Sequence, residues 1–316
     1  MDIVKEAFVE AGYDFSIAHK LSAIDKAEVI MTITERYYLQ AKIRYPFKKT
    51  VYWSQGVDGE EARWAGRNIL AIWFRFFAEN RAVNHADLPL FVSDAMLDYH
   101  KRRYGYKGIH HVIMPCFNKT SPDSFNVTQY DYPSFVYAGN ASVWQAADLM
   151  LDVYAGVEKC IPDARITILS NRKEVFMKKL QDRGIKNYDI KYVSLQEIDA
   201  ELHKYKYGFI LREPHIVNKV ATPTKMSTYL ASYLIPVFTD AVDDFKKNVN
   251  LGDFKLCADS PLTKENIVNM ICDFERQPHD FKQYKSYVDQ VFATHYNRES
   301  YREQIYLMIK KLGWTK

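Results

Sequence analysis

The sequence lacks the signals of several protein classes. Its four cysteines, Cys116, Cys160, Cys257 and Cys272, have no CxxC spacing, which favours a reduced, cytosolic chain. No run of roughly 18 apolar residues occurs, so no segment is predicted to span a membrane. The first residues contain no basic region leading into an apolar run, so we expect no secretory signal. A formal net charge of +4 is too small to indicate a nucleic-acid partner.

Motifs for common cofactors and metals are also missing. The sequence has no GxGxxG, so a nicotinamide-cofactor site lacks its fingerprint. It has no DxD motif, and no His/Asp cluster has the spacing of metal ligands. His110 and His111 are adjacent on a predicted strand, so their side chains point to opposite faces. We therefore expect no cofactor and no metal site.

The elements that are present predict an α/β protein. With 316 residues, 47% of them hydrophobic and 26% charged, the chain has the size and composition of two soluble globular domains. Short apolar strands alternate with helical periodicity, which is typical of parallel, doubly wound sheets. We place the first domain at residues 1–118, a linker at 119–132, the second domain at 133–295 and a terminal helix at 296–316, which would brace the first domain.

Individual elements of the prediction are specific enough to test. We expect a helix from Asp2 to Gly12, a strand from Tyr13 to His19 and a helix over residues 143–160. A long helix from Glu60 to Glu79 carries large apolar residues with arginines between them. We interpret that helix as part of the core. The alternative is a helix lying on a membrane surface, with its arginines on anionic lipid.

The stretch from Phe209 to Asp240 carries the most chemical information. It is predicted as strand 209–211, a loop to residue 221, a helix, and strand 235–239. The Thr-Pro-Thr at residues 222–224 resembles a helix start. Arg212 and Lys225 flank this start, and free amides at a helix N-terminus favour an anion such as phosphate.

The order of residues in this stretch resembles a known family. Arg-Glu, then Val-Ala-Thr-Pro-Thr-Lys, Tyr-Leu-Ala and Ile-Pro-Val are similar to the donor segment of retaining family 4 glycosyltransferases of the GT-B fold, the bacterial polysaccharide and lipopolysaccharide type. A weaker likeness lies near residues 52–61. The resemblance implies two Rossmann-like domains facing a cleft. It also implies metal-independent transfer of a sugar from a nucleotide diphosphate to a hydroxyl of a glycan or lipid-linked glycan. A cytoplasmic location, with peripheral contact to the inner face of a membrane, would suit such an acceptor.

The resemblance also assigns candidate site residues. Arg212 and Lys225 would be catalytic, stabilising the leaving diphosphate. The remaining candidates are donor-binding Gly139, Asn140, Arg172, Ser194, Glu213, Asn218, Thr222, Thr224 and Thr228, and acceptor-binding Trp53, Gln55 and Glu60.

The sequence departs from the family pattern at several positions. Thr228 stands where the family has a ribose-binding Glu, Val220 where many relatives have a second acid, and Tyr233 where Gly is common. The first strand and glycine-rich turn of the family are absent. Either the fold lacks these elements, or the given sequence starts inside a longer reading frame. These departures leave a non-catalytic sugar-nucleotide-binding subunit open as an alternative. A sugar-nucleotide epimerase of similar fold is a second alternative, which would need acid or histidine groups placed for proton transfer.

Overall fold

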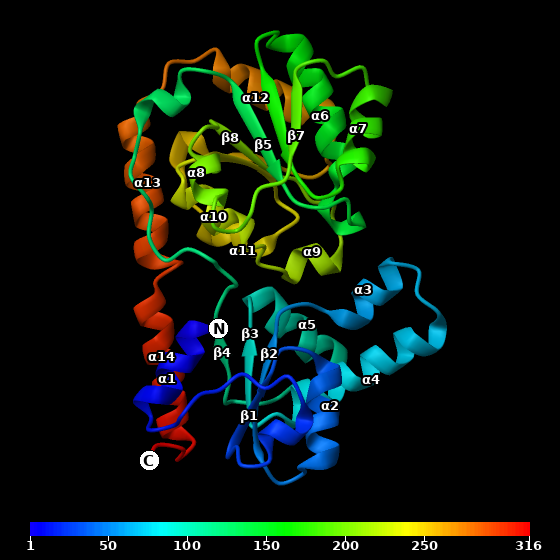
Figure 1. The fold of residues 1–316 in the computed structure, drawn as a ribbon, viewed down its shortest axis with the longest axis vertical. Helices are drawn as coiled ribbons and strands as arrows, with labels where there is room; N and C mark the ends of the chain where they lie inside the picture. Colours follow the sequence, from blue (N-terminus) through cyan, green and yellow to red (C-terminus); the bar gives the residue numbers. More distant parts are fainter. The chain divides into compact units, whose positions relative to one another are not determined.

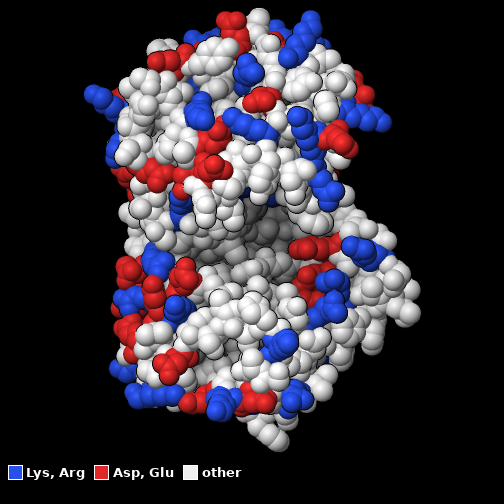
Figure 2. Space-filling model, in the orientation of Figure 1, with Lys and Arg blue, Asp and Glu red and all other residues white.

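The computed structural model describes residues 1–316, which form two compact units. Unit 1 comprises Met1–Cys116, Lys219–Thr222 and Asn297–Lys316, and unit 2 comprises Phe117–Asn218 and Pro223–Tyr296. Each unit is built on one parallel sheet with helices between its strands (Figure 1). On the face seen in Figure 2, basic and acidic side chains are interspersed over both units. The α/β class that the sequence predicts is confirmed.

Unit 1 is organised around a four-stranded sheet of order β1-β2-β3-β4. Its strands are β1 (Val29–Thr32), β2 (Lys49–Ser54), β3 (Leu88–Phe91) and β4 (Val112–Ile113). Its helices are α1 (Asp2–Glu10), η1 (Leu21–Ile24), α2 (Glu35–Arg44), α3 (Asp58–Trp64), α4 (Ile69–His85), α5 (Asp94–Tyr104) and α14 (Arg298–Lys311). The central strands β2 and β3 are buried almost throughout, as parallel strands covered on both faces are.

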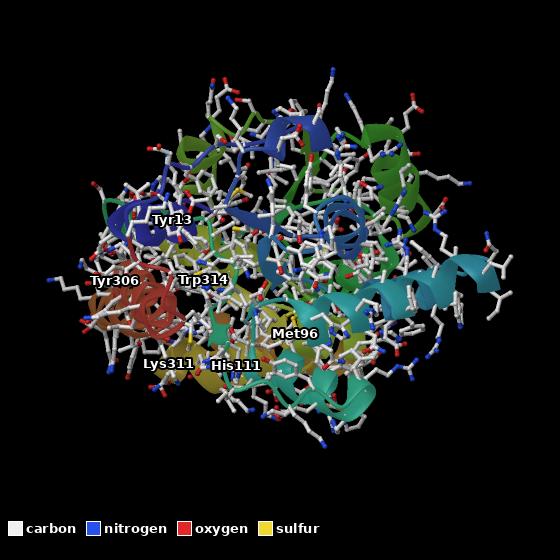
Figure 3. The ribbon with its side chains drawn as sticks, turned by 90° about the horizontal axis from the view of Figure 1, so that it is seen from below. Tyr13, Met96, His111, Tyr306, Lys311 and Trp314 are labelled. Carbon is white, nitrogen blue, oxygen red and sulfur yellow. A yellow bond between two sulfur atoms is a disulfide. The ribbon has the colours of Figure 1, made fainter.

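The two ends of the chain lie together in unit 1. Helix α14 packs against α1, where Arg298 forms an ion pair with Glu6. Tyr13 and Trp314 are both buried, and Figure 3 shows them near α1 and α14. The ammonium of Lys316 lies 4.5 Å from the centre of the Tyr13 ring. The C-terminal segment is therefore an integral part of unit 1.

Unit 2 contains a six-stranded sheet of order β10-β9-β8-β5-β6-β7. Its strands are β5 (Ser134–Ala138), β6 (Arg165–Leu169), β7 (Tyr188–Lys191), β8 (Tyr207–Ile210), β9 (Ile235–Thr239) and β10 (Leu256–Ala258). Its helices are η2 (Val127–Tyr130), η3 (Val143–Gln145), α6 (Ala147–Cys160), α7 (Lys173–Asp182), α8 (Ile198–Leu202), α9 (Ile216–Val220, whose last two residues belong to unit 1), α10 (Lys225–Ala231), α11 (Asp243–Asn248), η4 (Gly252–Phe254), α12 (Lys264–Glu275) and α13 (Phe281–Thr294). Figure 1 shows α6, α7 and α12 on one face of the sheet and α8 and α10 on the other. This is the doubly wound arrangement that right-handed crossovers produce.

The prediction of one continuous helix from Glu60 to Glu79 is wrong. It is two helices, α3 and α4, because Gly66 takes a left-handed φ of 64° between them. The Asn68 side chain then caps α4, accepting a hydrogen bond from the backbone N–H of Ala71 at 2.8 Å. The core interpretation also fails for one face of the first half of α4, where large apolar side chains are exposed. No helix of the structure has both the length and the apolar content needed to cross a membrane.

Three other predicted elements need correction. Residues 13–19 form no strand, because Tyr13 instead closes the turn after α1 through its backbone N–H to the carbonyl of Phe8. The predicted helix over residues 143–160 is broken at Ala146, which has a φ of 46°. The predicted loop after Arg212 contains the short helix α9.

The expectation of a fully reduced chain is also wrong in this structure. Cys160 at the end of α6 and Cys272 in α12 form a disulfide, with an S–S distance of 2.05 Å. Cys116 and Cys257 are free thiols. The two bonded cysteines are 112 positions apart, so only the packing of α6 against α12 brings them together.

Candidate functional site

The order of strands in unit 2 creates a natural binding position. Strands β5 and β8 are neighbours, with Phe135 beside Tyr207 and Val136 beside Gly208. The chain leaves β5 toward β6 and leaves β8 toward β9, which lie on opposite sides of this pair. In open α/β sheets, ligands bind at the carboxyl ends of strands where the order reverses in this way.

The turn after β5 is compact and rich in hydrogen bonds. The Tyr137 hydroxyl lies 2.6 Å from the Asn140 carbonyl oxygen and 2.9 Å from Gln145 Oε1. Gln145 Nε2 donates to Asn140 Oδ1 at 3.0 Å. A Cβ at Gly139 would lie 2.5 Å from Gln145 Oε1 and 2.9 Å from Lys225 Nζ. A larger residue at position 139 would therefore displace the ends of the Gln145 and Lys225 side chains from this turn.

Arg212 follows β8 and is only 5% exposed. Its backbone N–H donates to Thr239 Oγ1 at 3.1 Å, and the Thr239 hydroxyl donates to the Arg212 carbonyl at 2.7 Å. Its guanidinium donates through Nη1 to the carbonyl of Trp144. Burial lowers the pKa of Arg212 to about 10, although the nearby hydroxyls of Tyr137 and Tyr229 act in the opposite direction.

Lys225 is the first residue of α10 and reaches the same turn. Its ammonium donates to Gln145 Oε1 at 2.8 Å and lies 4.5 Å from the centre of the Tyr137 ring. Tyr229, one helical turn later, accepts a hydrogen bond from the backbone N–H of Ala138 at 2.9 Å. The helix is thereby tied to the end of β5. Burial, and then the charge of Arg212, hold the pKa of Lys225 well below its ordinary value.

Neither of these cations forms an ion pair with a carboxylate. Their hydrogen-bond partners are the Trp144 carbonyl and the Gln145 amide, which are neutral. Arg212 is buried and Lys225 is half-buried, and two such positive charges without a counter-ion are costly, because each loses hydration and each repels the other. A bound anion would supply the missing negative charge. The arrangement is therefore chemically suited to hold phosphate groups.

Comparisons with known proteins agree with this architecture. The sequence matches no protein-family model and no curated protein. Solved structures do match: sucrose-phosphate synthase from Thermosynechococcus elongatus has a TM-score of 0.73 and 13% identity, over 93% of this chain and 76% of that one. HepE from Anabaena in complex with UDP-glucose has a TM-score of 0.69 and 11% identity, over 92% and 80%. The chain has the GT-B fold.

A third GT-B neighbour is longer than this chain. The pneumococcal O-GlcNAc transferase GtfA, in complex with UDP and GlcNAc, has a TM-score of 0.67 and 10% identity. That match covers 98% of this chain but only 60% of GtfA.

The other donor candidates are placed as follows. Asn218 is buried and donates from Nδ2 to the carbonyl of Glu213 at 2.9 Å, while the Glu213 residue itself is exposed. Thr224 is the N-cap of α10 but makes no side-chain cap. The Thr228 hydroxyl donates back to the Thr224 carbonyl at 3.0 Å. Thr222 belongs to unit 1, where its Oγ1 accepts from the backbone N–H of Cys116 at 2.8 Å.

Arg172 and Ser194 follow the outer strands β6 and β7. Arg172 is exposed, and its backbone N–H donates to Ser170 Oγ at 3.2 Å. The Ser194 hydroxyl donates to Glu197 Oε2 at 2.6 Å. No hydrogen bond joins either residue to Arg212 or Lys225. They share the carboxyl edge of the sheet with the cation pair but are not part of its contact network.

The three acceptor candidates of unit 1 differ in their exposure. Trp53 in β2 is buried, so its ring offers no open platform in this structure. Glu60 is also buried, and it pairs with Arg63 at 3.0 Å and lies 3.3 Å from the Tyr99 hydroxyl. Gln55 alone is exposed, just beyond the end of β2.

Four residues of the cation network were not predicted from the sequence as site residues. They are Tyr137, Gln145, Tyr229 and Thr239. Tyr229 lies four positions after Lys225, so helical periodicity indicates that both lie on one face of α10. The contacts of Tyr137, Gln145 and Thr239 depend on how the strands are ordered.

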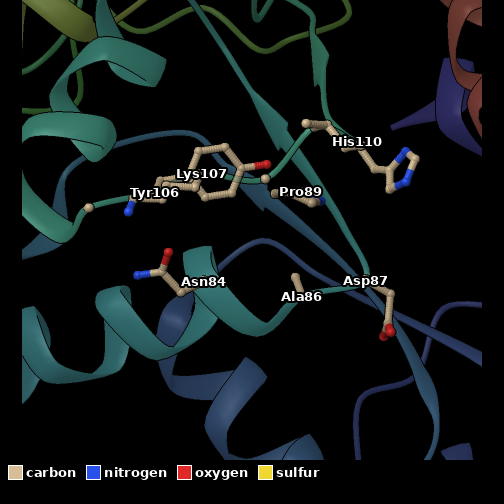
Figure 4. A pocket seen from close by; sticks show the side chains of 10 residues that line it. Asn84, Ala86, Asp87, Pro89, Tyr106, Lys107 and His110 are labelled. Carbon is tan, nitrogen blue, oxygen red and sulfur yellow. The ribbon is translucent and has the colours of Figure 1, made fainter.

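A surface pocket of unit 1 lies at the amino end of a strand of its own sheet. It has a volume of about 320 Å3 and is found at the amino end of β3, where Asp87, Pro89 and His110 line it (Figure 4). Asp87 Oδ2 already accepts hydrogen bonds from the backbone N–H and the hydroxyl of Thr50. Because ligands of open α/β sheets bind at the carboxyl ends of strands, we do not assign this pocket to the site.

Proposed function

We propose that the protein is a glycosyltransferase that moves a sugar from a nucleoside-diphosphate donor to a hydroxyl acceptor. The observation that carries the proposal is a pair of cations without a carboxylate partner, the buried Arg212 and the half-buried Lys225, at the strand-order reversal of unit 2. GT-B neighbours solved with UDP, UDP-glucose or GlcNAc support a sugar nucleotide as the ligand.

The chemistry follows from where charge develops. As the sugar–phosphate bond breaks, negative charge accumulates on the leaving diphosphate. Fixed cations stabilise that charge in the transition state more than in the ground state, which is the condition for catalysis. Arg212 and Lys225 would provide this stabilisation without a metal ion. Retention of configuration is consistent with the leaving diphosphate taking the acceptor proton on the same face.

The remaining donor candidates would then have distinct tasks. Backbone at Gly139 and the amide of Asn140 would contact the phosphates or the sugar, and Thr224 would contact phosphate at the start of α10. Thr228 would reach the ribose with a hydroxyl rather than a carboxylate. Arg172 and Ser194 would extend the site along the sheet edge. The acceptor would be a glycan or a lipid-linked glycan, for which Gln55 is the exposed candidate of unit 1.

The test is a binding and turnover panel. Calorimetry with UDP, GDP, dTDP and CMP identifies the nucleotide, and release of that nucleotide from its sugars, with a panel of acceptors, measures transfer. We expect Lys225→Ala to lower the rate by about a hundredfold to a thousandfold. Lys173→Ala is the matched control, because Lys173 also begins a helix of unit 2 but is exposed. If no nucleotide binds the folded wild type, the proposal fails.

One observation favours a second candidate, a sugar-nucleotide-binding subunit without turnover. The Thr228 hydroxyl is committed to the Thr224 carbonyl, and no carboxylate replaces the ribose-binding Glu at this position. Such a subunit would bind one nucleoside diphosphate in a Lys225-dependent way but release no nucleotide from any sugar donor. The same panel therefore separates the two candidates.

A further inference from the structure

The first half of α4 carries an apolar stripe that unit 1 leaves uncovered. The apolar stripe consists of Ile69, Leu70, Trp73, Phe74 and Phe77, which are 75%, 78%, 65%, 43% and 44% exposed. Their spacing of three and four residues places them on one face of the helix. The rings of Trp73 and Phe77 stack with their centres 5.7 Å apart. Exposed apolar patches of this kind mark interaction surfaces.

The opposite face of α4 is firmly packed. A Cβ on Gly59 of α3 would lie 2.3 Å from the Phe76 ring, so the two helices touch closely. Arg75 pairs with Glu35 at 3.3 Å and with Asp58 at 3.4 Å. Figures 1 and 3 both show the N-terminal turns of α4 extending beyond the sheet of unit 1. The outward direction of the apolar stripe is therefore fixed by the fold.

The exposed charges that flank the apolar stripe along α4 are basic. Arg67 precedes it and Arg81 follows it, and both are exposed. Arg103 at the end of α5 lies 4.3 Å from the centre of the Phe76 ring, and Arg63 lies 4.8 Å from it. The only acid of α4 is Glu79, which is fully buried. In Figure 2 the outer end of the lobe formed by α3 and α4 shows no acidic side chain.

We propose that α4 docks on the surface of a lipid bilayer that contains anionic phospholipids. Aromatic and aliphatic side chains flanked by arginines match such a surface, where rings enter the headgroup region and guanidiniums meet phosphates. Pairing with a second copy would bring the arginines of two apolar stripes together, and like charges oppose that contact. The inference concerns the location of the protein and does not depend on sugar transfer.

Vesicle flotation with the full chain tests the proposal. We expect binding to vesicles of phosphatidylcholine with 30% phosphatidylglycerol. Trp73→Gln/Phe77→Gln should weaken binding by about tenfold to a hundredfold, and Arg67→Gln by about fivefold. Ile17→Gln/Ile109→Gln is the matched control, because both isoleucines are exposed in unit 1 outside α4. All substituted side chains are exposed, so thermal unfolding confirms that each variant is folded.

A spectroscopic measurement identifies the contacting residue. In vesicles of brominated lipid, tryptophan emission should be quenched in the wild type and much less in Trp73→Phe, which keeps the ring and the binding. Absence of vesicle binding would overturn the proposal, as would equal binding by Trp73→Gln/Phe77→Gln. Self-association of the wild type that this double substitution abolishes, without lipid binding, would assign the surface to a second copy instead.

Discussion

Replacing Arg212 by methionine should make the unliganded protein more stable and the nucleotide-bound protein less stable than the wild type. Arg212 is 5% exposed and its guanidinium has no carboxylate partner, so the unliganded protein carries the cost of burying this charge. Methionine replaces the aliphatic part of the arginine side chain and carries no charge. The substitution therefore removes the cost of a buried cation and, in the same step, removes the anion's partner.

The expected stabilisation by Arg212→Met follows from the pKa of Arg212. Burial lowers the pKa of Arg212 from 12.5 to about 10, and about 1.36 kcal/mol per pKa unit gives a cost of about 3 kcal/mol at neutral pH. Against this, the variant loses the charged hydrogen bond to the Trp144 carbonyl, worth about 1.5–3 kcal/mol. The net expectation is stabilisation of the unliganded fold by roughly 1 kcal/mol. A nucleotide at a hundred times its dissociation constant adds about 2.7 kcal/mol to the free energy of unfolding of the wild type, and adds nothing to that of the variant.

Urea unfolding with and without the nucleotide identified by calorimetry measures both effects. The curves of the wild type and Arg212→Met should exchange their order when nucleotide is added. Arg165→Met is the control, because Arg165 is an exposed arginine of unit 2, and its curves should follow the wild type. Loss of more than about 1 kcal/mol by unliganded Arg212→Met would show that the arginine is structural, and the reasoning would be wrong.

Three further predictions test other features of the structure. Gly139→Ala should weaken nucleotide binding in calorimetry by at least about tenfold, because the added Cβ would lie 2.9 Å from the ammonium of Lys225; unchanged affinity would contradict this geometry. Burial raises the pKa of Glu79 from 4.5 to about 8. The protonated carboxyl therefore contributes fully to the free energy of unfolding below pH 4.5, and this contribution is lost as the pH rises through 8. Glu79→Gln should therefore be more stable than the wild type at pH 8 by roughly 3–5 kcal/mol, and parallel pH profiles of stability would refute this assignment. Replacing Cys160 and Cys272 by serine should lower the free energy of unfolding by about 2–4 kcal/mol; identical urea midpoints for the oxidised and reduced wild type would argue against the disulfide.

Sequence reasoning succeeded where local pattern and parallel topology act together. Apolar strands alternating with helical periodicity leave few alternatives to a doubly wound α/β fold. Arg212 and Lys225 are a candidate pair because they flank the predicted start of one helix and because the order of residues around them resembles the family's donor segment. Tyr233 stands where the family commonly has Gly, and it adopts a left-handed φ of 55°. In each case the decisive information lies within a few residues of the position.

Prediction from the sequence failed where the contacts of a side chain depend on residues far away in the sequence. Helical spacing of apolar residues from Trp64 to Phe77 indicates a face that needs cover, but it does not say whether the chain supplies that cover. The disulfide between Cys160 and Cys272 depends on the packing of α6 against α12, and spacing carries no sign of it. The contact of Gln145 with Lys225 likewise joins residues 80 positions apart.

The two proposed surfaces are unfavourable in the unliganded protein for opposite reasons, so substitutions can test them separately. Arg212 is a buried and Lys225 a half-buried charge without a counter-ion, whereas the apolar stripe on α4 is aromatic surface exposed without a partner. Each is unfavourable in isolation and becomes favourable only when a ligand supplies what is missing, an anion in one case and an apolar phase in the other. Arg212→Met should therefore abolish nucleotide binding and leave vesicle binding intact, and Trp73→Gln/Phe77→Gln should do the reverse. If either variant lost both activities while remaining folded, the two surfaces would be coupled, and neither could be interpreted as an independent site.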